Sequence, residues 1–386
     1  MTVPLLRVEA LKVEYPLPRR WWWRHPESVK AVDDVSFQLF EGETLGVVGE
    51  TGCGKSSLGR ALLQLVEPAA GRVVWLGQNL PDLPARALNR LRGELQLIFQ
   101  DPLSSLNPRM TIGDLIGEPL RVHRAALSAA ERRARVDDMM ARVGLAPQMI
   151  NRYPNEFSGG QCQRISIARA MILEPKLLVC DEPVSALDVS IQAQILNLLK
   201  DLQRDTGVAL LFISHDLSVV HFMCQRVLVM YLGRVMELGS RARLFASPLH
   251  PYTRALLSAV PEPDPARQRA REIVELVGDL PSPMDPPSGC VFYSRCPMAA
   301  PVCLTRRPVL ETAAVGHQDR QLIIGQQCIG LHPDCEHARR TFAANIACGP
   351  SARRFVRVNE ANPGIRESLA HLFGHALSIR LGVEKP

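Results

Sequence analysis

The stretch TLGVVGETGCGKSSL, Thr44–Leu58, constrains the fold of this chain more than any other. Its apolar start, Thr44–Val48, predicts a buried strand. The pattern G-x-x-x-x-G-K-S follows over Gly49–Ser56, and then a helix-compatible segment. Glycines let the loop curl so that its N–H groups face phosphates, and the helix N-terminus adds its dipole to the same anion. The sequence therefore predicts an α/β nucleotide-binding core, since strand and helix on either side disfavour a chance glycine-rich turn.

Each part of this phosphate loop has an expected role. Lys55 is expected to reach the β and γ phosphates of ATP as a point charge, and the Ser56 hydroxyl to hold Mg²⁺. The backbone around them is expected to wrap the phosphates. The predicted nucleotide-binding residues of the loop are Gly49, Glu50, Thr51, Gly52, Cys53, Gly54, Lys55, Ser56 and Ser57.

A second apolar strand is expected to close the site. The segment LLVCDEP, Leu177–Pro183, ends in two neighbouring carboxylates. Asp181 is expected to bind Mg²⁺ directly or through water, and Glu182 to polarise the water that attacks the γ phosphate. Alternatively, Asp181 and Glu182 lie in a solvated loop without a role. This is disfavoured because the two carboxylates end a buried strand in a phosphate-loop protein.

A second anion site is predicted where an amphipathic helix begins in FSGGQCQRISIARAMIL. The helix start leaves backbone N–H groups exposed. One ATP has no evident use for two such sites in the same chain. The economical arrangement is a head-to-tail pair of domains, in which the loop of one domain and this quartet of the other enclose one nucleotide. The quartet consists of Ser158, Gly159, Gly160 and Gln161.

Taken in order along residues 1 to about 317, these motifs resemble the ATP-binding subunit of ABC transporters. The resemblance implies that Gln100, in IFQDP, contacts Mg²⁺ and senses the permease. It implies that residues 185–188 form the D-loop and that His215, in FISHD, hydrogen-bonds the γ phosphate. Tyr15 lies where the family places an aromatic ring on adenine, although a lone tyrosine after a strand is as often a core or surface residue.

The resemblance implies an α/β fold: a RecA-like P-loop core with an antiparallel β layer and a helical subdomain, plus a loop-rich C-terminal extension. Strand-like patterns for the antiparallel layer fall at 5–15, 29–40 and 72–76. Patterns for the parallel core fall at 44–48, 95–99, 176–181 and 208–213. The helical subdomain is expected over about 101–157, where the family receives its membrane subunits, and Ser128 with Glu131 forms a capping box there.

The expected domains are a nucleotide-binding domain at 1–240, an extension at 241–317 and a divergent tail of unknown role at 318–386. Twelve of the 30 prolines fall between Ser247 and Val309, which favours a loop-rich region. The segment SPLHPYTRALLSAVP in this region resembles the peptide-importer branch, which handles dipeptides, oligopeptides, nickel and glutathione.

The expected function is therefore ATP hydrolysis that powers uptake of peptides or related small solutes. The alternative is a soluble ABC ATPase that acts on ribosomes or DNA. It is disfavoured because the chain has one set of motifs and no sustained heptads.

Three closely spaced cysteines leave several interpretations open. Cys290, Cys296 and Cys303 are predicted to hold a [4Fe–4S] cluster, to bind zinc, or to bind no metal; Cys328 is the expected fourth cluster ligand, with Cys335 as the second candidate. Some importers of this branch hold such a cluster, but they usually supply the fourth cysteine near residues 319–321, where this chain has none.

Charge and hydropathy suit a cytosolic chain, and the resemblance implies a peripheral subunit on the cytoplasmic face of the inner membrane. The net charge is +6, no signal peptide is evident, and no apolar run reaches the about 18 residues that span a bilayer. The resemblance implies a second, different ATPase subunit, two membrane permease subunits, an indirect extracytoplasmic solute-binding protein and no nucleic acid. Trp21–Trp23 fit the membrane interface or packing on their own domain equally well.

Overall fold

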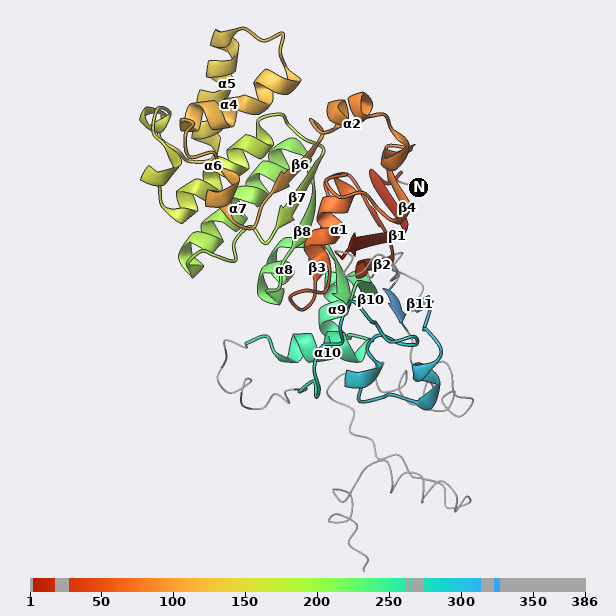
Figure 1. Ribbon diagram of the computed structural model, residues 1–386. Coiled ribbons are helices and arrows are strands. Elements are labelled where there is room, and N and C mark those ends of the chain that lie inside the picture. Colours follow the sequence, from red (N-terminus) through yellow and green to blue (C-terminus); the bar gives the residue numbers. More distant parts are fainter. Residues whose placement is uncertain are drawn as a thin grey trace, which may run out of the picture. The chain divides into compact units, whose positions relative to one another are not determined.

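In a computed structural model of the chain, we describe residues 3–17, 28–261, 264, 269, 274–313 and 323–326 (Figure 1). The chain divides into two compact units, Met1–His332 and Pro333–Pro386. The second unit, and with it most of the predicted tail, lies outside the described residues. Trp21–Trp23 and Cys328 lie outside them as well.

The first unit is built around a mixed eight-stranded sheet in the order β11-β12-β10-β9-β3-β8-β7-β6. Strands β6, β7, β8, β3 and β9 run parallel, and β10, β12 and β11 continue the sheet antiparallel. Every residue of β3, β7 and β8 is buried, as expected of parallel strands covered on both faces. The strand bounds are β3 Thr44–Val48, β6 Leu95–Ile98, β7 Leu177–Asp181, β8 Ala209–Ile213, β9 Arg226–Tyr231, β10 Arg234–Ser240, β11 Leu310–Ala313 and β12 Ile323–Gln326.

A separate antiparallel sheet forms the second layer, in the order β2-β1-β4-β5. Buried and exposed residues alternate along β2, because one face of the sheet packs on the core and the other meets solvent. The antiparallel layer and the parallel core are thus confirmed. The strand bounds are β1 Leu6–Pro16, β2 Ser28–Leu39, β4 Ala70–Trp75 and β5 Gln78–Asn79.

Helices α4, α5 and α6 gather beside the β6 edge of the large sheet (Figure 1). The predicted capping box is present at the start of α5, where Ser128 and Glu131 bond each other's backbone N–H groups. Among the described residues, none of the helices combines the length and the hydropathy that a bilayer span requires. The helix bounds are α1 Lys55–Leu62, α2 Ala85–Leu91, α3 Pro102–Ser105, α4 Ile112–His123, α5 Ala129–Arg142, α6 Gly159–Met171, α7 Val189–Thr206, α8 Leu217–Met223, α9 Arg241–Ala246 and α10 Pro251–Ser258.

The C-terminal extension packs into the main core rather than forming a core of its own. Tyr252 of α10 and Phe292 are fully buried in the apolar cluster that also contains strand residues of β7 and β8. Rings of Tyr231, Tyr252 and Phe292 meet edge to face, with centroids 4.8 and 5.2 Å from Tyr231. Aromatic contacts of this kind hold the extension against the end of β9.

Candidate nucleotide site

The phosphate loop lies between β3 and α1, as its sequence predicts. Lys55 opens the helix, and Gly54 before it takes a left-handed backbone with φ of 101°. A Cβ atom at Gly54 would lie 1.9 Å from the carbonyl oxygen of Ala31 on β2, so only glycine fits. The second sheet therefore presses on the loop and sets its shape.

The lysine and the serine of the motif both form hydrogen bonds within the site. The buried Lys55 Nζ donates to the carbonyl oxygens of Gly49 and Glu50, at 2.9 Å each. Ser56 Oγ donates to Asp181 Oδ1 across 2.8 Å. Burial raises the pKa of Asp181, although the bond from Ser56 opposes this. A hydroxyl and a carboxylate at hydrogen-bond distance are the oxygen ligands that Mg²⁺ prefers, so these residues fit a magnesium ion.

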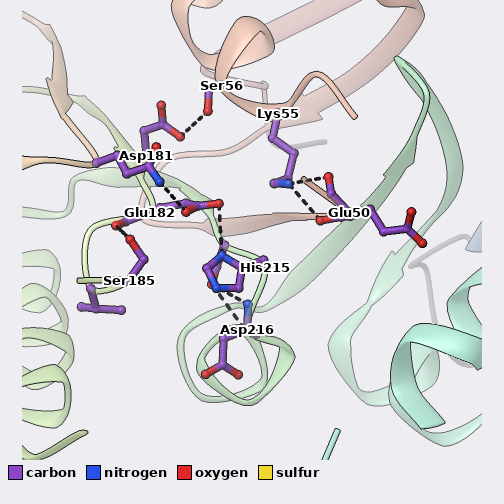
Figure 2. A network of polar contacts seen from close by, with 12 residues as sticks. Glu50, Lys55, Ser56, Asp181, Glu182, Ser185, His215 and Asp216 are labelled. Atoms are coloured by element: carbon purple, nitrogen blue, oxygen red, sulfur yellow. Dashed lines mark hydrogen bonds and ion pairs between the residues drawn. The ribbon is translucent and has the colours of Figure 1, made fainter. Parts of the chain in front are cut away.

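Three side chains meet at the end of β7 and β8. Gln100 Nε2 donates to Glu182 Oε2 at 2.9 Å. Figure 2 shows His215 next to Glu182, with His215 Nδ1 3.2 Å from Glu182 Oε1. Glu182 has a left-handed backbone, with φ of 47°, and its N–H donates to the carbonyl oxygen of Ile213. Non-glycine residues in this conformation are strained and gather at functional sites.

These groups surround one cleft of about 760 Å³. Tyr15 is at its rim, where its hydroxyl donates to Ser57 Oγ at 3.2 Å. The predicted site residues that line the cleft are Tyr15, Thr51, Gly52, Gly54, Lys55, Ser56, Ser57, Gln100, Glu182 and His215. Asp181 lies behind Ser56, and Gly49, Glu50 and Cys53 belong to the loop without lining the cleft.

Other residues line the cleft that the sequence did not reveal. Val29 and Ala31 come from β2, because Val29 pairs with Tyr15 across the antiparallel sheet. Pro283 comes from the extension, and its carbonyl accepts from the Lys30 N–H at 3.2 Å. No local motif marks these residues. Val29 and Ala31 reach the cleft because β2 pairs with β1, and Pro283 reaches it because the C-terminal extension folds back against the site.

The quartet Ser158–Gln161 begins α6 outside the cleft of its own chain. Ser158 and Gln161 form a capping box that satisfies backbone N–H groups at the helix start, and Ser158 and Gly159 are exposed. A Cβ atom at Gly160 would lie 2.5 Å from Ile191 of α7, which explains the small residue there.

The cysteine cluster is only partly described. Cys290 and Cys303 are buried, and the Cys290 N–H donates to the Cys303 carbonyl at 2.8 Å. Cys296 is half-buried. Over the residues that the structure covers, no three metal-ligating side chains come together. Cys328, the predicted fourth ligand, lies outside that part.

A phosphate loop, an acidic pair ending a parallel strand and an antiparallel layer over the loop define an ABC-type ATPase, which binds ATP with Mg²⁺. Residues 32–185 match the family described as ABC transporter. Two dimeric structures of MJ0796, a bacterial ABC transporter cassette, one bound to ADP and Pi, are similar at 28% identity. Each has a TM-score of 0.55 and covers 61% of this chain and 98% of its own.

Closer sequence relatives narrow the family. Residues 236–303 match the family described as oligopeptide/dipeptide transporter, C-terminal region. The oligopeptide transport ATP-binding proteins OppF of Salmonella typhimurium and Escherichia coli are each 58% identical over 309 residues, which cover 80% of this chain and 92% of theirs. A probable peptide ABC transporter ATP-binding protein, y4tS of Sinorhizobium fredii, is 52% identical over 80% of this chain and 87% of its own. The chain belongs to this family of ABC transporter ATP-binding subunits, and these matches do not favour a soluble ATPase acting on ribosomes or DNA.

Proposed function

We propose that this chain hydrolyses ATP to power the uptake of peptides or related small solutes through a membrane ABC importer. The observation that carries the proposal is the meeting of Gln100, Glu182 and His215 beside the phosphate loop. The likeness of the extension to the oligopeptide/dipeptide transporter region supports the peptide class of substrate.

We assign the phosphate loop to the triphosphate. Lys55 would exchange its two carbonyl partners for phosphate oxygens, and the loop N–H groups would donate to the same anion. Ser56, Asp181 and Gln100 would hold Mg²⁺, which neutralises charge on the β and γ phosphates when bound. Tyr15 at the rim would stack on adenine.

Glu182 is assigned as the residue that orients the attacking water. Its carboxylate already accepts from Gln100 and lies next to His215, so its two oxygens face the reacting end of the cleft. His215 would then donate to the γ phosphate. Both groups act by holding a proton or water in place rather than by covalent chemistry.

Ser158–Gln161 are assigned to the nucleotide of a partner subunit. They begin α6 outside the cleft of their own chain, and the similar MJ0796 cassettes are described as dimers. We propose a different ATPase chain as the partner, so that this quartet completes its site and the partner's quartet completes this one.

A groove of about 400 Å³, lined by residues of β6, α4 and α6, is the proposed docking site for the membrane subunits. Phe99 and Val122 on its rim are exposed apolar side chains, 42% and 70% accessible. Ser105, in the predicted helical subdomain, lines it as well. Closure of two such subunits on ATP would pull their helical subdomains together and move a pair of permease chains between inward and outward states.

The rest of the assembly follows from this assignment. We place the chain at the cytoplasmic face of the inner membrane as a peripheral subunit, with an extracytoplasmic solute-binding protein as an indirect partner and no nucleic acid. We keep the domain limits at 1–240, 241–317 and 318–386, with the helical subdomain at about 101–157.

The [4Fe–4S] cluster stays a prediction, which the described cysteines do not support. It is tested by purifying the chain without oxygen and assaying iron, zinc and acid-labile sulfide. About four irons and four sulfides per chain would support a cubane cluster. Absence of all three elements would remove it.

Glu182→Gln tests the hydrolysis assignment. The amide keeps the shape of the side chain but cannot accept the proton, so ATP should still bind while turnover falls by at least about 100-fold. ATP-bound dimers should then accumulate on a sizing column. Glu41→Gln, an exposed glutamate, is the matched control and should behave as wild type. Unchanged turnover in the Glu182 variant would remove that residue from the reaction.

A further inference from the structure

Glu50 belongs to the phosphate loop, yet its side chain serves another contact. Figure 2 shows the carboxylate pointing away from Lys55 and from the group around Glu182. Arg295 of the extension donates to this carboxylate: its Nη1 lies 3.0 Å from Glu50 Oε1 and 2.8 Å from Glu50 Oε2. The two side chains are 11% and 27% exposed, so solvent screens this ion pair only in part.

A second bond joins the extension to the same residue. The Tyr252 hydroxyl, on α10, accepts from the Glu50 backbone N–H at 2.9 Å. Tyr252 is fully buried, and its ring packs on Tyr231 and Phe292. The guanidinium of Arg295 lies 5.9 Å from the centre of the Tyr231 ring, within range of a cation–π contact. Both groups that bond Glu50 are therefore held in place by packed aromatic side chains.

Glu50 also has a partner on the nucleotide side. Its carbonyl oxygen accepts from Lys55 Nζ, so one residue joins the extension to the lysine that faces the phosphates. The extension reaches the cleft a second time at Pro283, which lines it and bonds β2 through Lys30. Two separate contacts thus place the extension against the nucleotide site, from behind the loop and at its wall.

We propose that Arg295 and Tyr252 position the phosphate loop for ATP, so that the extension of this peptide-importer branch sets nucleotide affinity. Arg295 is a positioning residue, because it acts through Glu50 and does not touch the cleft. The inference rests on the proposed function for the identity of the nucleotide. Without the bonds from Arg295 and Tyr252 to Glu50, the loop loses its pre-formed shape, and ATP must order the loop when it binds. This weakens ATP binding but leaves the rate of the chemical step unchanged.

The test is a double-mutant cycle on Arg295→Ala and Glu50→Gln, with MgATP affinity and steady-state ATPase kinetics measured on the full chain. Each single variant should weaken MgATP binding and raise KM about tenfold, the size expected for losing a charged hydrogen bond. For Arg295→Ala, which lies outside the cleft, the kcat at saturating ATP should stay within about twofold. The double variant should be no weaker than the worse single variant, because both substitutions remove the same ion pair.

Further variants separate positioning from general damage. Tyr252→Phe keeps the ring and removes only the hydroxyl, so it should raise KM and lower the melting temperature only by the small amount expected for one lost hydrogen bond. Arg306→Ala, an exposed arginine of the same extension, should match wild type. Exchange of the charges in Arg295→Glu with Glu50→Arg should restore part of the lost affinity.

Three outcomes would overturn the proposal. The losses of MgATP affinity could add in the double-mutant cycle, or kcat and kcat/KM could fall by the same factor in the Arg295 variant. The Arg295 variant could also bind MgATP as tightly as the Arg306 variant does. A drop in melting temperature that by itself accounts for the lost affinity would make Arg295 merely structural and overturn it too. The assay of wild type beside Glu182→Gln tests the proposed function separately. If the wild-type chain neither binds nor hydrolyses ATP, the proposed function itself is wrong.

Discussion

His250 should make this protein lose stability in mild acid. The residue is 1% exposed, its Nδ1 accepts from the Tyr252 N–H at 3.1 Å, and it caps α10. Nε2 has no hydrogen-bond partner within the described ranges. Burial lowers the pKa of His250 from 6.5 to about 3. The folded protein therefore keeps this imidazole neutral at a pH where the unfolded chain protonates it.

The sign follows from proton linkage. The folded-state pKa is depressed, so the stability is fully present above 6.5 and is lost as the pH falls toward about 3. At pH 5 the unfolded chain gains about 2 kcal/mol from protonating this one group. The carboxylate of Glu237 accepts from the backbone N–H of His250, and burial raises the pKa of Glu237. Glu237 therefore adds stability as the pH falls, which opposes the effect of His250. A comparison of variants is therefore needed to isolate the histidine.

His250→Asn isolates it, because asparagine can still cap α10 but does not titrate. Urea unfolding followed by fluorescence at pH 7.5 and pH 5 gives the free energy of unfolding. Between these two conditions wild type should lose about 2 kcal/mol more than the asparagine variant. The exposed His221→Asn control should keep the wild-type loss. Equal losses in wild type and His250→Asn would refute the reasoning.

Three further outcomes are expected. Gly54→Ala should abolish MgATP binding and lower the free energy of unfolding by about 1–3 kcal/mol, because the new Cβ would meet the Ala31 carbonyl. MgATP titration and urea unfolding measure the two effects, and near-normal binding would contradict the prediction. Ser128→Ala should cost about 1 kcal/mol in urea unfolding while ATPase activity is kept, since only the cap of α5 is lost. His215→Ala should lower kcat far more than it raises the KM for ATP, and the reverse pattern would remove its role at the γ phosphate.

Local motifs predicted the parts of the site that a phosphate or a helix start dictates. Gly54 and Lys55 follow from how a backbone must curl around an anion, and Ser128 follows from the spacing of a capping box. These features need only neighbours in sequence, so the sequence shows them directly.

Contacts between distant segments could not be predicted in this way. Arg295 reaches Glu50 across 245 positions, and its local sequence, FYSRCP, carries no sign of a phosphate-loop partner. Val29 reaches the cleft only through its pairing with Tyr15. The cysteine pattern was ambiguous for a related reason, since spacing along the chain does not decide which thiols meet.

Uptake of a labelled oligopeptide tests the central claim most directly. The chain, its partner ATPase and the permease subunits are reconstituted in liposomes with the solute-binding protein and peptide on the opposite side from ATP. The account predicts accumulation that requires MgATP and is lost with Glu182→Gln but kept with Glu41→Gln. ATP hydrolysis by the assembled complex without peptide accumulation, or accumulation that persists in the Glu182 variant, would contradict it.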